Sequence, residues 1–260
     1  MTTELHLFAG IGGGVLAGQM LGHRPVVAVE KNEFCRAVLA DRFPELELHE
    51  DVKLFDGSPY RNRIDIIAGG FPCQPLSCAG KMLAEDDPRH LWPEMARIVE
   101  EVQPEYVFCE NVSIKAFEGP YRDLRRLGYT VPEALCLGAV DVGLPHRRNR
   151  WWLLAHSDSA GRQLERPAGS GVRQPRHDAD GLRPDVPEPV RSGPPAWQGA
   201  EAQRAHAAEV RSAWWPHQSH LARVTHGFPG RVDRVRALGN AQVPSVAATA
   251  FRILKELHYS

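Results

Sequence analysis

Short apolar runs alternate with amphipathic stretches over the first 155 residues, and no other feature constrains the fold as strongly. Apolar runs of about five residues predict strands, and stretches with apolar residues three or four positions apart predict helices. Alternating strands and helices wind into a mostly parallel sheet with helices on both faces. We therefore predict an α/β fold of the doubly wound type, in which ligands bind where the strands end.

The pattern assigns each expected element to a range of residues. The predicted strands are residues 5–9, 26–30, 64–68, 106–110 and 151–155. The predicted helices are residues 33–42, 91–102, 121–127 and 245–257. From residue 156 to about 212 the sequence is instead rich in Pro, Gly, Arg, Asp and Glu. Such a segment buries too little apolar surface to offset its ordering entropy, so we expect a loose or disordered insertion there.

The composition excludes several classes of protein. At 260 residues, 43% hydrophobic and 24% charged, the chain suits one α/β domain, with or without a small lobe, rather than a collagen-like or disordered protein. A net charge of -1 argues against coating of nucleic acid by bulk electrostatics and leaves room for a local basic groove. The 26 arginines against 5 lysines suit planar recognition of phosphates and bases, and a GC-rich genome would explain the same ratio.

Cysteine usage and hydropathy bear on the compartment. The 5 cysteines, without a CxxC pair, are typical of a reducing cytoplasm, and they favour neither a disulfide framework nor a metal site. A lone cysteine is most often a small buried side chain, which suffices for Cys35, Cys109 and Cys136. No signal-peptide pattern and no apolar run of about 18 residues occurs, so we expect a cytoplasmic protein without a membrane partner.

A glycine-rich turn, LFAGIGGG at residues 7–14, follows the first predicted strand. Glycines allow a ligand to approach the backbone closely, and the helix that follows offers free N–H groups. The dinucleotide fingerprint is incomplete, because it needs a glycine at Val15. Glu30 ends the second strand, where an acid can accept hydrogen bonds from ribose hydroxyls. Together they suggest a nucleoside-containing cofactor, and a plain strand-to-helix turn fits equally well.

Four further motifs follow in order. GGFPCQPLS at residues 69–77 sets Cys73 between two prolines that restrict its backbone, which suits a nucleophile. Glu110 emerges from an apolar strand, where burial would raise its pKa and suit it to proton donation, and an acidic strand cap fits as well. Arg148 and Arg150 would lie on one face if the chain is extended there. A solvated basic patch is the ordinary explanation of such a pair. LGNAQVP at residues 238–244 predicts a turn before the last helix.

These five motifs, in this order, resemble the cytosine-5 DNA methyltransferases. The resemblance covers nearly all of the chain outside residues 156–212. It implies a Rossmann-like fold that binds S-adenosyl-L-methionine, with residues 1–155 and 236–260 as the catalytic domain. Residues 156–235 would then form a short target-recognition region.

The resemblance also implies roles for single residues. Cys73 would be the nucleophile, Glu110 would face the cytosine, and Arg148 and Arg150 would surround the base and the nucleophile loop. The implied cofactor contacts are Phe8, Gly10, Gly12, Glu30, Asp51 and Asn240. The implied substrate loop includes Pro72, Gln74 and Ser77.

The chemistry of the family accounts for these residue types. Cytosine C5 is a poor nucleophile, so addition of a thiolate at C6 activates the ring toward methylation. A carboxyl at N3 and the exocyclic amine stabilises the charge that develops on the ring, and an arginine at O2 assists it. Loss of the C5 proton then expels the thiolate. The target base must first be flipped out of the duplex.

Three departures from the family pattern leave alternatives open. His6 stands where an acid usually precedes LFAG, and His146 stands where a Gln usually opens the QxRxR motif. The recognition region is short and rich in proline, so base readout lacks a visible scaffold. The alternatives are a catalytically impaired relative that binds only DNA or cofactor, and an RNA cytosine-5 methyltransferase.

The resemblance implies partners as well. We expect duplex DNA as the partner of a monomeric, bacterial or phage-encoded enzyme, with or without a cognate restriction endonuclease. Arg231, Arg234 and Arg236 gather just before the last motif, and we expect this cluster to contact DNA phosphates.

Overall fold

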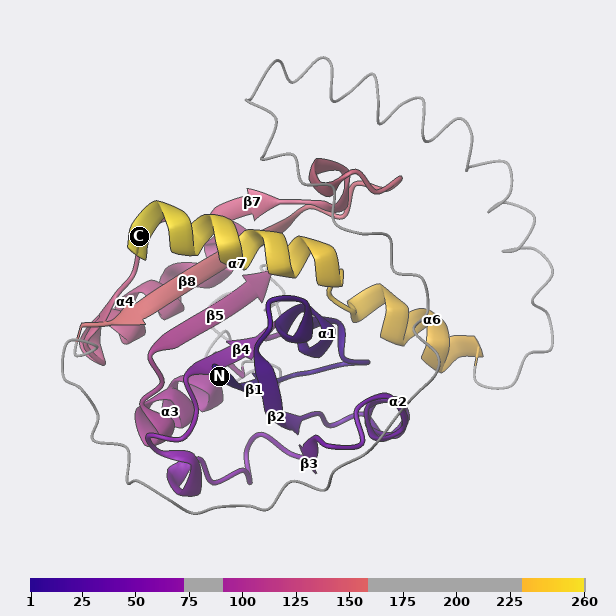
Figure 1. Ribbon diagram of the computed structural model, residues 1–260, viewed down its shortest axis with the longest axis horizontal. Helices are drawn as coiled ribbons and strands as arrows, with labels where there is room; N and C mark the ends of the chain where they lie inside the picture. Colours follow the sequence, from indigo (N-terminus) through magenta and orange to yellow (C-terminus); the bar gives the residue numbers. More distant parts are fainter. Residues whose placement is uncertain (73–90, 159–230, 260) are drawn as a thin grey trace, which may run out of the picture.

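The computed structural model describes residues 1–72, 91–158 and 231–259, which form one sheet with helices on both faces (Figure 1). Within these ranges the sheet has 8 strands. They are β1 (Thr3–Leu7), β2 (Arg24–Val29), β3 (Glu47–His49), β4 (Ile66–Gly69), β5 (Tyr106–Asn111), β6 (Tyr129–Thr130), β7 (Leu135–Leu137) and β8 (Arg150–Ser157).

The sheet is mostly parallel, as predicted. The strand order is β3-β2-β1-β4-β5-β8-β6, and β7 also pairs with β8. The neighbours from β3 to β5 are parallel, whereas β8 runs antiparallel to β5, β6 and β7. The chain passes from β1 to β2 on one side and later returns to β4 on the other. In such sheets a ligand crevice forms at this point, outside the carboxyl ends of the strands.

The described α-helices surround this sheet. They are α1 (Gly13–Met20), α2 (Glu33–Arg42), α3 (Trp92–Val102), α4 (Glu118–Arg126), α6 (Arg231–Asn240) and α7 (Pro244–Tyr259). Helix α2 begins at Glu33 because the side chain of Asn32 accepts a hydrogen bond from the backbone N–H of Cys35. Among these described helices, none has both the length and the hydrophobicity needed to cross a membrane.

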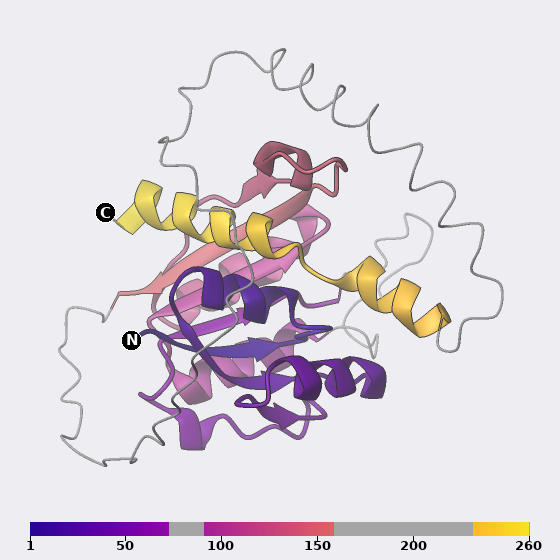
Figure 2. The same cartoon turned by 45° about the vertical axis from the view of Figure 1, so that its right-hand side comes forward.

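Alternating side chains give the sheet two apolar faces. On one face, Ile67 of β4 and Val107 of β5 belong to a core that includes the buried residues of α3 and α4. On the other face, Ile66 and Phe108 pack in a second core with α7, whose Phe251 is buried there. Figures 1 and 2 show α7 running along this second face beside α1. The two cores hold the carboxyl ends of the parallel strands in fixed positions.

All of the predicted strands and helices are present, with ends that differ by a few residues at most. The first strand ends at Leu7 rather than at residue 9, because Phe8 takes a left-handed backbone with φ 56°. Residues 238–240 end α6 instead of forming the predicted turn, which is shorter and follows Asn240. Cys35 and Cys109 are buried as expected, whereas Cys136 is exposed on the short strand β7, so the prediction of burial is wrong there.

Some predictions fall on residues outside the described ranges. Cys73, Gln74 and Ser77 are among them, and so is nearly all of the expected insertion at residues 156–212. Strand β8 continues to Ser157, and the described chain resumes at Arg231.

Candidate active site

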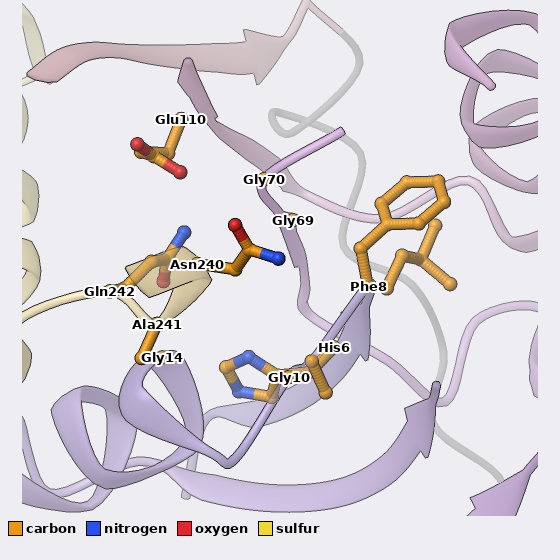
Figure 3. A pocket seen from close by; sticks show the side chains of 12 residues that line it. His6, Phe8, Gly10, Gly14, Gly69, Gly70, Glu110, Asn240, Ala241 and Gln242 are labelled. Carbon is orange, nitrogen blue, oxygen red and sulfur yellow. The ribbon is translucent and has the colours of Figure 1, made fainter. Parts of the chain in front are cut away.

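Two adjoining cavities lie at the carboxyl ends of the parallel strands. The large cavity has a volume of about 680 Å³, and its lining includes Phe8, Glu30, Pro72, Glu110, Arg150 and Asn240. The small cavity, of about 30 Å³, lies between the start of α1 and the turn after α6, and its lining includes His6, Gly14, Gly70, Glu110, Asn240 and Gln242 (Figure 3). Phe8, Gly10, Gly70, Glu110 and Asn240 line both cavities.

Glu110 lies on the wall that the two cavities share. Its side chain is 12% exposed, and its Oε1 is 2.9 Å from Nε of Arg150. A β-carbon at Gly70 would lie 2.6 Å from Oε2 of Glu110, so a larger residue there would displace this carboxyl. Burial raises the pKa of Glu110, and the charge of Arg150 and a hydrogen bond with Gln242 only partly offset this effect. The direction agrees with the sequence prediction, and it favours a proton-bearing carboxyl nearer to neutral pH.

The two arginines of the QxRxR-like segment have different contacts. Arg150 begins β8, which pairs antiparallel with β5, and its side chain therefore reaches Glu110. Arg148 precedes the strand with a left-handed φ of 39° and donates to the backbone oxygens of Gly239, at 2.7 Å, and Ala241. The prediction that both share one face of an extended chain is wrong, because the strand begins only at Arg150.

Glu30 joins the glycine-rich turn to the end of β2. Its Oε2 accepts from the backbone N–H of Gly10 at 2.7 Å, and its Oε1 accepts from that of Asn32 at 2.8 Å. Each carboxylate oxygen retains a second lone pair for a ligand donor. Glu30 and Gly10 both line the large cavity.

Gly12 and Asp51, two of the expected cofactor residues, have structural contacts outside the lining of the large cavity. Gly12 has a φ of 91°, and a β-carbon there would lie 2.5 Å from the ring of Phe43, so this glycine is required by packing against α2. Asp51 accepts from Nζ of Lys31 at 3.1 Å and from the backbone N–H of Lys53 at 3.0 Å. Lys31 lines the large cavity, whereas neither Gly12 nor Asp51 is among the described residues that line it.

The turn after α6 closes the site from the far end of the chain. A β-carbon at Gly13 would overlap with the backbone oxygen of Gln242, so the absence of a side chain allows this turn to approach α1. Asn240, Ala241 and Gln242 consequently face the glycine-rich turn across the small cavity (Figure 3).

Two residues that sequence reasoning missed complete the site. Asn111 is 2% exposed, and its Nδ2 donates to the backbone oxygen of Phe71 at 3.0 Å. This bond anchors the segment that leads to Pro72. Gln242 reaches Glu110 from the other side. Asn111 directly follows Glu110, and Gln242 lies in the LGNAQVP motif at residues 238–244, so an amide side chain close to a predicted site residue is the signal that the sequence offers.

Known proteins resemble this chain over much of its length. A family model described as C-5 cytosine-specific DNA methylase matches residues 2–193. The Type II methyltransferase M.Eco47II of Escherichia coli is 36% identical over 162 residues, which are 59% of this chain and 39% of that protein. The Type II methyltransferase M.NgoMIV of Neisseria gonorrhoeae is 32% identical over 217 residues, which are 80% of this chain and 66% of that protein.

A solved structure gives a similar result. It is that of a prophage-encoded Escherichia coli protein assigned as a DNA modification methyltransferase, and it matches with a TM-score of 0.53 and 27% identity. The match covers 63% of this chain and 49% of that one. The chain thus spans between 39% and 66% of the length of these relatives.

Proposed function

Because the chain belongs to the C-5 cytosine-specific DNA methylase family, we propose that it transfers a methyl group from S-adenosyl-L-methionine to C5 of a cytosine in DNA. The observation that carries the proposal is the position of Glu110. This buried carboxyl has a raised pKa, is held by Arg150, and lies between a cavity that reaches Glu30 and the segment that leads to Cys73. A carboxyl that contacts the cytosine ring must lie next to both the methyl donor and the nucleophile, and the position of Glu110 meets this requirement.

The residues of the large cavity fit S-adenosyl-L-methionine. Its volume of about 680 Å³ is within the usual range for such ligands. Glu30 offers free lone pairs to ribose hydroxyls, and at Gly10 even a β-carbon would meet nothing within 4 Å, so a ligand can approach the backbone. Phe8 and Asn240 line the same space, and contact of Asp51 with the adenine amino group stays a prediction. When bound, this molecule supplies an electrophilic methyl group.

The chain's own residues would act on the cytosine as follows. The thiolate of Cys73 adds to C6, and the proton-bearing carboxyl of Glu110 donates to N3 as negative charge develops on the ring. Arg150 holds the carboxyl in place, and Arg148 holds the end of α6, where Asn240 lies, and the turn after it. After C5 has been methylated, N3 returns its proton to the Glu110 carboxylate, the C5 proton is lost to solvent, and breakage of the bond between Cys73 and C6 restores the ring.

The test is transfer of a labelled methyl group from S-adenosyl-L-methionine to duplex DNA. We expect transfer by the wild type and none by Cys73→Ser, because a serine hydroxyl is not ionised near neutral pH. Cys136→Ser is the matched control, since Cys136 is exposed and outside both cavities. Equal labelling by wild type and Cys73→Ser would rule out Cys73 as the nucleophile.

The same assay distinguishes the other functions. Transfer to tRNA in place of DNA would establish an RNA methyltransferase, and binding of S-adenosyl-L-methionine without transfer to any DNA would indicate an impaired relative. The match to a DNA methylase family favours DNA.

We also propose that residues 156–235 read the DNA site, while residues 1–155 and 236–260 form the catalytic domain. The chain leaves the sheet after β8 and returns in α6, whose Arg236 and Ala237 line the large cavity. Because β8 runs antiparallel to β5, a recognition segment between these two points would begin at the edge of the sheet where β5 starts and would end close to the catalytic face. Bisulfite sequencing of DNA from cells that express the protein would identify the methylated site. Methylation of every cytosine, without a preferred site, would contradict this division.

A further inference from the structure

The side-chain amide of Gln242 lies between two glycines and points toward Glu110. A β-carbon at Gly14 of α1 would lie 2.7 Å from Oε1 of Gln242, and a β-carbon at Gly70, which follows β4, would lie 3.3 Å from its Nε2. Side chains at these two positions would crowd the amide, so the glycines leave the space that it fills. Figure 3 shows the amide nitrogen on the side that faces Glu110. The side chain thus reaches from the turn after α6 to the end of β5.

This amide is the second donor to the carboxyl of Glu110. The first is Arg150, whose Nε lies 2.9 Å from Oε1. Gln242 makes a hydrogen bond with the same carboxyl, and its Nε2 lies on the side of Oε2, because a β-carbon at Gly70 would be close to both atoms. A carboxylate only accepts, so Nε2 donates. With a donor on each side the carboxyl has a fixed orientation, and each oxygen keeps a second position for a base in the large cavity, which Glu110 also lines.

Both donors favour the charged form of Glu110, which is the form that remains after its proton has been donated. Burial raises the pKa of this carboxyl, and Arg150 and Gln242 act against that rise. In the proposed mechanism the proton moves from Glu110 to N3 of the cytosine, so negative charge appears on the carboxyl during the reaction. Donors that are already in position stabilise this charge without any rearrangement.

Building on the proposed function, we propose that Gln242 is a positioning residue for methyl transfer, whose amide orients the carboxyl of Glu110 toward the cytosine and stabilises the carboxylate that proton donation leaves. Gln242 itself transfers no proton. Its backbone oxygen lies so close to Gly13 that a β-carbon there would overlap with it, so contact of the turn with α1 sets the position of the amide. The turn that closes the site therefore also supplies the second donor to Glu110.

Titration of Glu110 by carbon-13 NMR of its carboxyl group tests the contact without any substrate. The Glu110→Gln variant assigns the signal. Gln242→Met nearly keeps the length of the side chain but removes the donor, so the pKa of Glu110 should rise by about one pH unit. Gln242→Glu keeps the size of the side chain and replaces a donor with an acceptor, so the last proton of the two carboxyls should leave at a still higher pH.

Single-turnover transfer of a labelled methyl group to long duplex DNA of mixed sequence tests the consequence for the reaction. With S-adenosyl-L-methionine at saturation, Gln242→Met should lower the rate at the pH optimum about tenfold or more, because the carboxyl of Glu110 is no longer held in one orientation. The descending limb of the pH profile should move to higher pH together with the pKa of Glu110. Gln19→Met is the matched control, since Gln19 is an exposed residue of α1 and is not among the described residues that line either cavity. It should keep the wild-type rate and profile.

The outcomes are distinguishable. An unchanged pKa of Glu110 in Gln242→Met, or a rate loss confined to low cofactor concentrations, would overturn the role of Gln242 and leave the proposed function intact. Wild-type behaviour of Gln242→Glu in both measurements would mean that the residue only fills space, with the same consequence. A wild-type protein that transfers no methyl group to DNA would overturn the proposed function, and the NMR titration alone would then decide whether Gln242 holds the carboxyl.

Discussion

Glu110 combines a buried carboxyl with a guanidinium partner, and this combination predicts the pH dependence of the rate. Since its pKa is raised, the proton-bearing form persists to higher pH than in water, and it is lost as the pH rises through that pKa. The fraction of Cys73 that is ionised to the thiolate, by contrast, increases with pH. We therefore expect a bell-shaped profile of the single-turnover methylation rate, with a descending limb that belongs to Glu110.

The Glu110→Gln variant tests the origin of that limb. An amide keeps the size of the side chain but does not titrate, so the descending limb should disappear while the ascending limb remains. We expect the rate at the optimum to fall by about 10² to 10⁴, as for loss of a positioned proton donor. A descending limb that persists in Glu110→Gln would assign it to another group.

At the residue scale, sequence reasoning found side chains whose partners are set by strand order. Glu110 ends an apolar strand, and a parallel α/β fold brings that end to the ligand crevice. The hydrogen bonds of Arg148 could not be predicted in this way, because its acceptors are 91 and 93 residues away along the chain. The same holds for Glu30, since its carboxylate binds backbone N–H groups that no sequence pattern marks.

At the scale of elements, the close approach of α1 and the turn after α6 depends on Gly13. A β-carbon there would overlap with the backbone oxygen of Gln242, so Gly13→Ala must push the turn away from α1. We expect the variant to lose about 1–3 kcal/mol of unfolding free energy, as overpacking does, and to bind S-adenosylhomocysteine more weakly. Urea denaturation and calorimetry would measure the two effects.

Gly239→Ala is the matched control for this prediction. Gly239 also belongs to a helix, and a β-carbon there would meet nothing within 4 Å. The unfolding free energy of the Gly239→Ala variant should stay the same or rise by about 1 kcal/mol, because alanine is the better helix former. Equal losses in the two variants would show that the close approach at Gly13 has no special importance.

Elements with a strong local signal were the ones that the sequence predicted well. Helix α2 has the predicted bounds, since an Asn32 cap precedes its apolar residues. Helix α6 was not predicted, because residues 231–240 were interpreted only as a cluster of arginines followed by a turn. Strands β6 and β7 are too short for a period of two to be visible.

For the whole molecule, the net charge of -1 means that the proposed binding of DNA must rely on where the arginines lie. Helix α6 carries Arg231, Arg234 and Arg236, and Arg236 lines the large cavity. Replacing all three with Gln should weaken DNA binding and flatten its salt dependence, by about 0.9 in the logarithmic slope for each phosphate that is no longer neutralised. Titrations at several salt concentrations would measure the slope.

The control for this experiment changes arginines of α4, which packs with α3 against one face of the sheet. Arg122 and Arg126 of α4 are exposed there, and the paired variant Arg122→Gln, Arg126→Gln should leave the slope unchanged. If the α6 variant kept the wild-type slope, the groups that bind phosphate would have to lie elsewhere in the chain.

The overall architecture followed from alternation in the first 155 residues, because strand and helix periods are local properties. The meeting of α6 and α7 with the glycine-rich turn is a long-range property, and the motif order indicated it only through the resemblance to a known family. The antiparallel placement of β8 beside β5 was likewise not predicted, since an apolar run does not encode its direction.

The position of α7 also matters for the order in which the protein is made. A ribosome that has synthesised residues 1–158 has already supplied every described strand of the sheet. The face formed by Ile66, Phe108 and Trp152 is then still without the helix that buries it. This apolar face of the nascent sheet lacks α7 until residues 244–259 are synthesised, about 90 residues later. At ordinary elongation rates this takes about ten seconds.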